Sequence, residues 1–530
     1  MPNHWTARPL RRLGGVALAI GATTALLTGC GGGGGGGANG GAGGDAEYVS
    51  GGTFTMAFNA DPGKLDPQSS AGTGLFSISQ LAYDRLLAID PEGQVVSGLA
   101  SEWSLDGTTV EMTLAEGITC SDDSELTASD VKANLDYVGD PENASPFLGV
   151  FLPAGATVTA DDAARTVTLE LAAPAPFVLQ GLANLPIVCK SGLDDRDALA
   201  DSSLGTGPYE LSEAQPGNQY TYTRREGYTW GPGGATTDEV GLPDTIVVRV
   251  IENESTAANL LTSGEINAAI VAGADAQRLE AQDLFSTQTQ AIVGEQWYHH
   301  GDDHVTSDPA VRLALTQALD LEELQKVLTA NRGGPPTTFA AIDPVGCPGD
   351  SVTPALPGQD VDAARAALEE AGVSKITFVY NTAVAGSGSA AAAELAVQQW
   401  EEVGLEVEAR PEGSAAIQET VFGTGDWDVA WLPLNVNYPD QLVPFLSGTT
   451  APDGTNFAEI ENADYEAGVA EASKLPAEEG CATWLEAEAN LVEDADVFPF
   501  ANSLVKTFGN GAEFEYPGQF VPTSIRMLAK

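Results

Sequence analysis

The sequence predicts an α/β protein built from several domains. Between residues 308 and 432, segments with helical spacing alternate with segments typical of strands, which indicates an α/β domain. The chain before residue 308 is richer in predicted strands. At 530 residues the chain is longer than one hydrophobic core usually supports, so two or three domains are expected.

Apolar alternation and a capping signal mark the elements of the first half. Alternating apolar residues predict a first strand at 52–58. Thr127 and Asp130 mark the start of a helix, because threonine caps helices and aspartate suits the first turn. A short helix at 255–263 is expected to end at Gly264. Further strands are expected at 109–114, 165–171 and 245–251.

The second half begins with a strong helix start. Asp308 is a cap and Pro309 occupies the first helical position, so we expect one helix that continues to about Leu328. The later expected elements are helices at 360–371, 389–403 and 414–422, and strands at 375–380, 405–410 and 427–432.

The first thirty residues have the layout of an export signal. Three arginines precede an apolar stretch from about Val16 to Leu27, which is shorter than the roughly 20 residues that a membrane span needs. The segment Leu27-Thr28-Gly29-Cys30 resembles the lipobox of bacterial lipoproteins, in which the signal is cut before the cysteine and the cysteine carries the lipid. The alternative is an ordinary signal peptide with an incidental cysteine at that position.

We therefore expect residues 1–29 to be a lipoprotein signal peptide and Cys30 to be lipidated. Residues 30–46 are rich in glycine, which is typical of a flexible tether. No later segment has 18 uninterrupted apolar residues, so no further membrane span is expected.

The charge balance is strongly acidic. The chain has 23 Lys and Arg residues against 75 Asp and Glu residues, a net charge of −52, and removal of residues 1–29 takes away three arginines and brings the net charge to −55. Such a chain repels nucleic acid, because phosphate binding depends on clustered basic residues. The acidic residues are dispersed, which favours a solvated surface; net charge alone does not support selection for cationic ligands.

Four cysteines remain once Cys30 is set aside, and an even number in an exported chain predicts disulfides. Three pairings are possible. We favour Cys120–Cys189 and Cys347–Cys481, because each pair then lies within one expected domain. The chain has no C-x-x-C, which argues against a redox or zinc motif.

Motifs for catalysis are missing from the sequence. It contains no G-x-S-x-G, H-E-x-x-H or Walker A motif. Ser503 and Lys506 form an S-x-x-K, but the S-D-N and K-T-G elements that accompany it in penicillin-binding proteins and β-lactamases are absent. We expect a protein that is not an enzyme and has no cofactor; a surface-anchored hydrolase is the competing class.

Three of the four histidines lie close together in the chain. His299, His300 and His304 are weak candidates for a metal site, since imidazoles beside carboxylates suit zinc, nickel or copper. The alternative is a polar segment that leads into the helix at 308.

Several short motifs follow one another in a fixed order between residues 65 and 320. They are Leu65-Asp66-Pro67, Tyr83–Leu87, Leu99–Trp103, Leu114–Ile118 with Leu126–Val131, Gly205–Tyr209, Arg225–Trp230 and Asp308–Asp320. In this order they resemble the family 5 solute-binding proteins of ABC importers, which bind peptides, nickel and other solutes. Tyr83–Leu87 is similar to the family's Y-x-x-L-L helix.

The resemblance implies a three-domain, two-lobed fold of the periplasmic-binding-protein type, class II. Domain I is discontinuous and covers 47–85, 200–285 and 500–530. Domain II is an insertion at 86–199, and domain III, of α/β type, covers 286–499. The favoured disulfides then lie in domains II and III.

The resemblance also implies function and location. Two lobes close on an extracellular solute, and the closed form docks on the permease subunits of an ABC importer. We expect a monomer on the outer face of the cell membrane, held by its lipid and without nucleic-acid partners. A surface-anchored sensor on the same fold and a binder of nickel or a metal chelate are alternatives.

The segment 427–439 is the expected ligand loop, because it runs from a strand end into a loop. In peptide-binding relatives an aspartate four residues before its proline pairs with the peptide amino group, and here that position is Asn435. This predicts an uncharged ligand contact: a blocked peptide, a sugar or another polar metabolite. A shifted alignment makes Asn437 or Asp440 the relevant residue. Other expected ligand contacts, for which core packing or turn formation is the alternative, are Trp431, Trp297, Tyr298 and Asn456.

Overall fold

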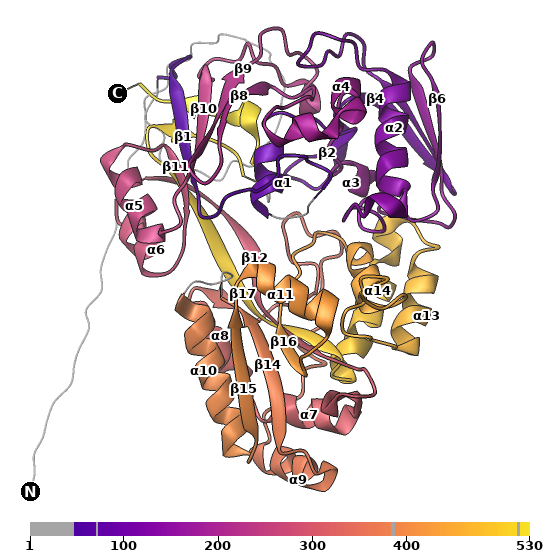
Figure 1. Ribbon diagram of the computed structural model, residues 1–530, viewed down its shortest axis with the longest axis vertical. Helices are drawn as coiled ribbons and strands as arrows, with labels where there is room; N and C mark the ends of the chain where they lie inside the picture. Colours follow the sequence, from indigo (N-terminus) through magenta and orange to yellow (C-terminus); the bar gives the residue numbers. More distant parts are fainter. Residues whose placement is uncertain (1–46, 70–72, 283, 383–386, 517–519, 530) are drawn as a thin grey trace, which may run out of the picture. The chain divides into compact units, whose positions relative to one another are not determined.

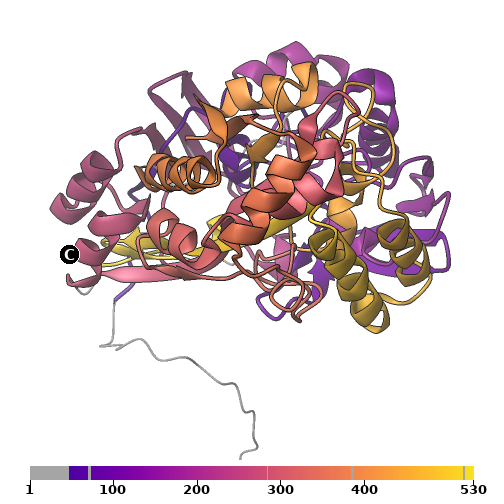
Figure 2. The same ribbon diagram turned by 90° about the horizontal axis from the view of Figure 1, so that it is seen from below.

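The computed structural model describes residues 47–69, 73–282, 284–382, 387–516 and 520–529 (Figures 1 and 2). These residues all belong to one unit that begins at Glu47. The predicted signal peptide, the tether and Cys30 lie outside the described residues.

Strands from the beginning, the middle and the end of the chain share one mixed sheet of eleven described strands. They are β1 (Thr53–Phe58), β8 (Tyr209–Gln215), β9 (Gln219–Arg224), β10 (Thr245–Val250), β11 (Ala268–Val271), β12 (Phe285–Tyr298), β13 (Gly333–Gly334), β14 (Lys375–Asn381), β15 (Glu406–Glu412), β16 (Val429–Trp431) and β17 (Val497–Gly509). The order is β15-β14-β16-β12-β17-β11-β1-β10-β9-β8, and β13 pairs with β17.

The long strands β12 and β17 connect the two ends of this sheet (Figure 1). They pair antiparallel from Phe285 opposite Gly509 to Trp297 opposite Val497. The 14 residues of β12 span roughly 45 Å at the usual rise per residue. The register shifts between Ile292 and Glu295, which marks a bulge in the middle of the ladder.

The first hydrophobic core lies on the β1 end of the sheet. β1 pairs in parallel with β10 and β11, and side chains such as Phe54 and Ile246 are completely buried. Asn253 caps the predicted helix at 255–263, and Gly264, in the left-handed conformation, ends it. The other elements of this part are α1 (Thr73–Ser79), α5 (Glu254–Ser263), α6 (Gly273–Glu280), β18 (Ala512–Glu513) and β19 (Arg526–Met527).

The second core covers a separate antiparallel sheet. Its strands β4 (Ala100–Asp106), β5 (Thr109–Leu114), β7 (Thr166–Glu170) and β6 (Thr157–Asp161) pair in that order, with α2 (Ala128–Gly139) beside them. The sequence predicted a helix start at Thr127 and Asp130, and in the structure these two residues form a capping box. Shorter elements are β2 (Leu87–Ile89), β3 (Val95–Ser97), α3 (Val178–Leu182) and α4 (Lys190–Asp194).

The third core is the largest, and here β14 pairs in parallel with both β15 and β16. Helices contribute Leu315, Ala396 and Leu491, which are buried against these strands and against β12 and β17. The helices are α7 (Pro309–Gln317), α8 (Leu321–Leu328), α9 (Val361–Ala371), α10 (Ser387–Glu402), α11 (Ser414–Glu419), α12 (Val443–Leu446), α13 (Ala463–Ala472) and α14 (Ala477–Glu493).

Two disulfides join Cys120 to Cys189 and Cys347 to Cys481. This is the pairing favoured from the sequence. The first bridge is completely enclosed in the second core, and the second bridge ties the segment before α9 to α14. In a chain-entropy account, each bridge stabilises the folded state by restricting the unfolded chain.

Two expectations about helices are wrong. The single helix expected from 308 to 328 is two helices, because Asp320 leaves the helical conformation and its carboxylate accepts the N–H of Glu323 at 2.9 Å to cap α8. The segment 83–87 is not helical; Leu87 instead begins strand β2.

Three of the motifs that carry the family resemblance meet at one buried carboxylate, that of Asp84. It accepts hydrogen bonds from Thr206 Oγ1 at 2.9 Å, Tyr228 Oη at 2.8 Å and Trp230 Nε1 at 3.1 Å. Burial raises the pKa of Asp84, and the three donors oppose that rise. Since Tyr228 and Trp230 also belong to the second hydrophobic core, these motif residues hold two parts of the fold together.

The two glycines of Gly205–Tyr209 lie directly against the backbone of Ala82. A Cβ atom at Gly205 would lie 2.3 Å from the Ala82 carbonyl oxygen, and one at Gly207 would lie 2.4 Å from its carbonyl carbon. Only glycine fits at such distances, since the obstructing atoms are backbone.

We predict that Gly207→Ala lowers the free energy of unfolding by about 2–3 kcal/mol, because the added methyl group forces the backbone at Ala82 to move. Chemical denaturation measures the change. Gly358→Ala is the matched control: a Cβ atom there meets nothing within 4 Å, so its effect is expected within about 0.5 kcal/mol. Equal stability of the two variants contradicts the steric argument.

Candidate functional site

The segment that follows β16 is fastened to the middle of β12 by the side chain of Asn435. Its Oδ1 accepts the N–H of Ile292 at 2.8 Å, and its Nδ2 donates to the carbonyl of Ile292 at 3.0 Å. Both ends of the amide are therefore engaged by backbone, at the point where the ladder changes register. Asn435 anchors the loop in this arrangement, and its predicted ligand contact stays a prediction.

A buried acid, Glu295, also holds this loop by a hydrogen bond. Its Oε2 accepts the N–H of Leu434 at 2.7 Å, while Oε1 is buried and has no hydrogen-bond partner among the described residues. Burial raises the pKa of Glu295 to about 8, although the bond from Leu434 lowers it. At neutral pH this carboxyl group is therefore mostly uncharged.

Asn437 fastens the loop on its other side. Its Nδ2 donates to the carbonyls of Ile342 at 3.0 Å and Asp343 at 3.3 Å, and its own N–H donates to Gln441 Oε1 at 3.1 Å. Asp440 is the other residue that a shifted alignment places at the predicted ligand-contact position. Its Oδ1 is buried without a partner among the described residues, and burial raises its pKa to about 7.

The predicted aromatic contacts are placed in the third core. Trp297 Nε1 donates to the carbonyl of Leu432 at 2.9 Å, and Trp431 Nε1 donates to Gln296 Oε1 at 2.9 Å. Tyr298 is completely buried, with its hydroxyl 2.7 Å from that of Thr316. Their polar atoms are thus satisfied within the protein, and their roles as ligand contacts remain predictions.

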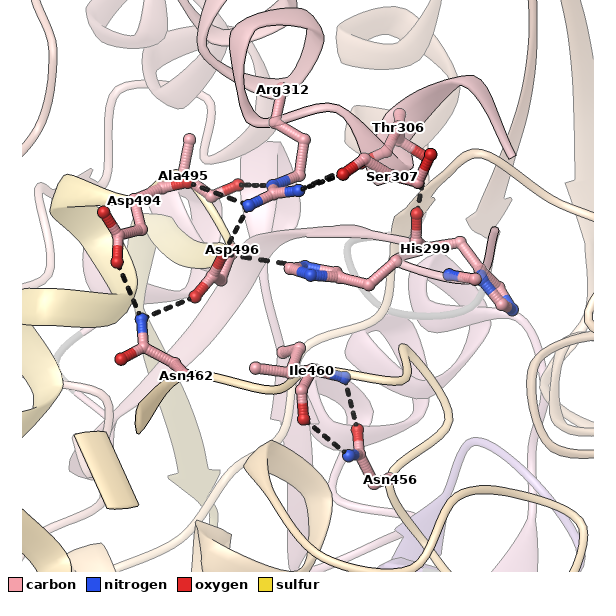
Figure 3. A network of polar contacts seen from close by, with 12 residues as sticks. His299, Thr306, Ser307, Arg312, Asn456, Ile460, Asn462, Asp494, Ala495 and Asp496 are labelled. Atoms are coloured by element: carbon pink, nitrogen blue, oxygen red, sulfur yellow. Dashed lines mark hydrogen bonds and ion pairs between the residues drawn. The ribbon is translucent and has the colours of Figure 1, made fainter. Parts of the chain in front are cut away.

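Asn456 is also completely buried and forms a local turn. Its Oδ1 accepts the N–H of Ile460 at 2.9 Å, and its Nδ2 donates to the carbonyl of Ile460 at 2.9 Å (Figure 3). This is the turn role that the sequence analysis gave as the alternative to a ligand contact.

The three neighbouring histidines do not surround a common point. The rings of His299 and His304 are stacked with centroids 3.9 Å apart, and His304 Nδ1 lies 3.3 Å from Asp428 Oδ1. His300 Nε2 lies 3.7 Å from Asp496 Oδ1. Within the ranges that the structure describes, no group of three or more histidine, cysteine or acidic side chains is arranged to hold a metal ion.

Burial instead keeps two of these imidazoles neutral. It lowers the pKa of His299 to about 4 and that of His300 to about 3, and nearby positive groups add to the effect. The charged residue that binds this region is Arg312, which donates to Asp496 Oδ1 at 2.8 Å and to the carbonyl of Thr306 at 3.1 Å (Figure 3). These contacts hold the start of α7 to Asp496, the residue directly before β17.

A separate surface hollow of about 280 Å³ lies between α10 and the strands β14 and β15. Tyr380 and Glu394 are among the residues that line it, and none of the predicted ligand contacts does. It is therefore not the site that the sequence analysis expected.

Sequence reasoning missed Glu295, the buried acid that binds the loop after β16. The signal was present, because this acid interrupts the apolar segment Ala291–Tyr298. An acidic residue in a strand that is otherwise buried calls for a partner or a raised pKa.

We predict that the protein loses stability as the pH rises from about 6.5 to 8.5, and that Glu295→Gln reduces this loss. Unfolded glutamate ionises near 4.3, so folded Glu295 holds its proton more tightly, and its contribution is lost as the pH rises through about 8. Glu295 accounts for at most about 1.4 kcal/mol of this loss per pH unit. Melting temperatures across this range measure it.

Asp440 and Glu488, whose pKa values burial raises to about 7, act in the same direction, so the variant keeps part of the slope. The depressed pKa values of His299 and His300 act below about pH 6.5, outside the window. Identical slopes in the wild type and in Glu295→Gln contradict a raised Glu295 pKa.

Comparison with known proteins identifies the relatives of this chain. Residues 94–456 match the family of bacterial extracellular solute-binding proteins, family 5. The glutathione-binding protein GsiB of Escherichia coli K12 is 27% identical over 340 residues, which cover 62% of this chain and 60% of GsiB. The match thus spans about three fifths of the length of that curated relative.

Solved structures share the fold over most of the chain. A substrate binding protein from Microbacterium hydrocarbonoxydans, complexed with 4-hydroxybenzoate hydrazide, has a TM-score of 0.77 and 25% identity and covers 90% of this chain and 99% of its own. DppA from Helicobacter pylori, in complex with the peptide STSA, has a TM-score of 0.76 at 18% identity, with 91% and 99% coverage. These likenesses confirm the multi-domain α/β fold expected from the family resemblance.

Proposed function

Because this chain belongs to family 5 of the bacterial extracellular solute-binding proteins, we propose that it captures an extracellular solute and delivers it to the permease of an ABC importer. Its domains are those expected from the sequence: 47–85 with 200–285 and 500–530, then 86–199, and then 286–499. Three hydrophobic cores, centred on these regions, support this division.

The observation that carries the proposal is the attachment of the ligand loop to the shared strand ladder. β12 and β17 link the first core to the third, and Asn435 and Glu295 fasten the loop to β12 at the bulge. A solute held between this loop and the first domain contacts both lobes, and such a solute favours closure by its higher affinity for the closed form. The family consists of solute-binding proteins, so the proposed activity is binding and release.

The ligand is proposed to be a small peptide or peptide-like solute without a recognised cationic end. The relatives named above bind glutathione, a hydrazide and a peptide. At the position where peptide-binding relatives carry an aspartate, this chain carries the amide of Asn435, and Glu295 beneath it is mostly neutral. Neither group offers the charge-assisted hydrogen bond that an ammonium group needs.

We predict that blocking the amino terminus of a peptide does not weaken its binding. Calorimetry with trialanine and N-acetyl-trialanine is expected to give dissociation constants within about threefold of one another, whereas loss of an ammonium–carboxylate contact costs about tenfold or more. Mass spectrometry of solute released from the denatured, purified protein identifies the natural ligand. The neutral contact is contradicted if free trialanine binds with a much lower dissociation constant than N-acetyl-trialanine and Asn435→Ala abolishes that binding.

The protein is further proposed to be a monomer anchored to the outer face of the cell membrane through lipid on Cys30, after removal of residues 1–29. Among the described residues, no helix has the length and apolar character that crossing a membrane requires. The lipobox-like Leu27–Cys30 and the glycine-rich segment after it support a lipid anchor on a flexible tether.

We predict that Cys30→Ser moves the protein from the membrane fraction to the medium or the soluble fraction. The serine hydroxyl does not replace the thiol as the site of the lipid, and the chain then has nothing to hold it at the bilayer. Cell fractionation measures the location of the variant, and the intact mass of the wild-type protein shows whether Cys30 carries a lipid. Retention of Cys30→Ser in salt-washed membranes rules out this anchor.

A further inference from the structure

A small hydrophobic cluster joins the inserted second domain to the third domain. Its buried members are Phe177, Cys347, Tyr438, Ala472 and Trp484. Phe177 comes from the region 86–199, and every other member comes from 286–499. The second domain therefore contributes a single aromatic side chain to a pocket that the third domain provides.

Phe177 packs against two aromatic rings. Its ring centroid lies 5.2 Å from that of Tyr438 and 6.3 Å from that of Trp484, and only 2% of the residue is exposed. Aromatic pairs at such distances stabilise an interface beyond the area they bury. The two domains also approach one another elsewhere, since a Cβ atom at Gly93 would lie 3.3 Å from Pro344.

Tyr438 connects this pocket to the ligand loop. It directly follows Asn437, and Gln441 Oε1 accepts the N–H groups of both residues, at 3.2 and 3.1 Å. Its ring lies against Gly346, where a Cβ atom would be 2.2 Å from Tyr438 Cδ1. The position of this ring and the position of the loop are therefore set together.

The disulfide between Cys347 and Cys481 braces the wall of the pocket. It links the segment that contains Gly346 to α14, and Trp484 lies three residues after Cys481 on the same side of that helix. Gly346 is also bonded to the loop, since its N–H donates to the carbonyl of Asn437 at 2.8 Å. Loss of the bridge frees one side of the pocket without touching Phe177.

We propose that Phe177 is a positioning residue for solute binding: it docks the second domain on Tyr438 and so holds the ligand loop in place, with the Cys347–Cys481 bridge keeping its pocket closed. The consequence for the solute rests on the proposed function. The docking itself does not rest on the proposed function. Because of the docking, the structural order of the ligand loop depends on the second domain and on the oxidation of one disulfide.

Hydrogen–deuterium exchange of the full chain without added solute tests the docking. In Phe177→Ala, exchange at 342–348 and 434–441 is expected to become about tenfold faster, because these backbone segments lose their support. Strands β5 and β14, at the centres of the second and third domains, are expected to keep their wild-type exchange. Phe177→Leu retains an apolar side chain and is expected to restore part of the protection.

Val178→Ala is the matched control, since Val178 is equally buried but belongs to the second core alone. It is expected to leave 342–348 and 434–441 unchanged. Faster exchange in β5 with no change in the two loop segments of Phe177→Ala overturns the proposal, because Phe177 then serves only its own domain. If Phe177→Ala does not fold, the comparison of Phe177→Leu with Val178→Ala decides in the same way.

A pair of double variants tests the brace. Cys347→Ala/Cys481→Ala is expected to reproduce the faster exchange at 434–441, whereas Cys120→Ala/Cys189→Ala, which removes the bridge inside the second core, is not. Unchanged exchange at 434–441 in the first double variant overturns the role of the disulfide. Since none of these measurements uses a solute, a failure of the proposed function leaves their outcome intact.

Discussion

The antiparallel pairing of β12 with β17 is the constraint on which the rest of the structure depends. The chain leaves the first core through one of these strands and returns through the other, so the first and third cores share a single hydrogen-bonded ladder. The ladder is continuous except at the bulge between Ile292 and Glu295, where strands bend and twist most readily. The proposed ligand loop is fastened at that same point, so the solute recognition that we propose lies next to the bulge.

Much of the fold could be predicted because its signals are local. Thr127 and Asp130 specify a helix start by a hydrogen-bond pattern that needs no distant partner, and the apolar alternation at 109–114 specifies a strand with one buried face. The order of domains that we propose rests on the family resemblance. The break at Asp320 was missed because apolar spacing continues through it, and only the capping contact with Glu323 shows that the helix starts anew.

The candidate site could be predicted much less well, because its chemistry depends on distant partners. An asparagine in a loop can face a solute or bind backbone, and the bonds between Asn435 and Ile292 connect residues 143 positions apart. The same holds for Trp297 and Tyr298, whose polar atoms find partners in the loop after β16 and in α7. Residue type identifies what a side chain can donate or accept; the tertiary structure decides whether that capacity is already used.

The carboxylate of Asp84 has a consequence for how this architecture changes in evolution. The second core, which comes mostly from the proposed domain at 86–199, also contains Tyr228 and Trp230 from outside that range, and both bind Asp84. Removal of 86–199 therefore leaves two aromatic side chains in the rest of the chain without their packing partners. The isolated segment 86–199 in turn lacks part of its own core. Residues 86–199 are contiguous in sequence but do not form a complete core by themselves. Substitutions in this segment and in the residues that complete its core are therefore expected to be coupled.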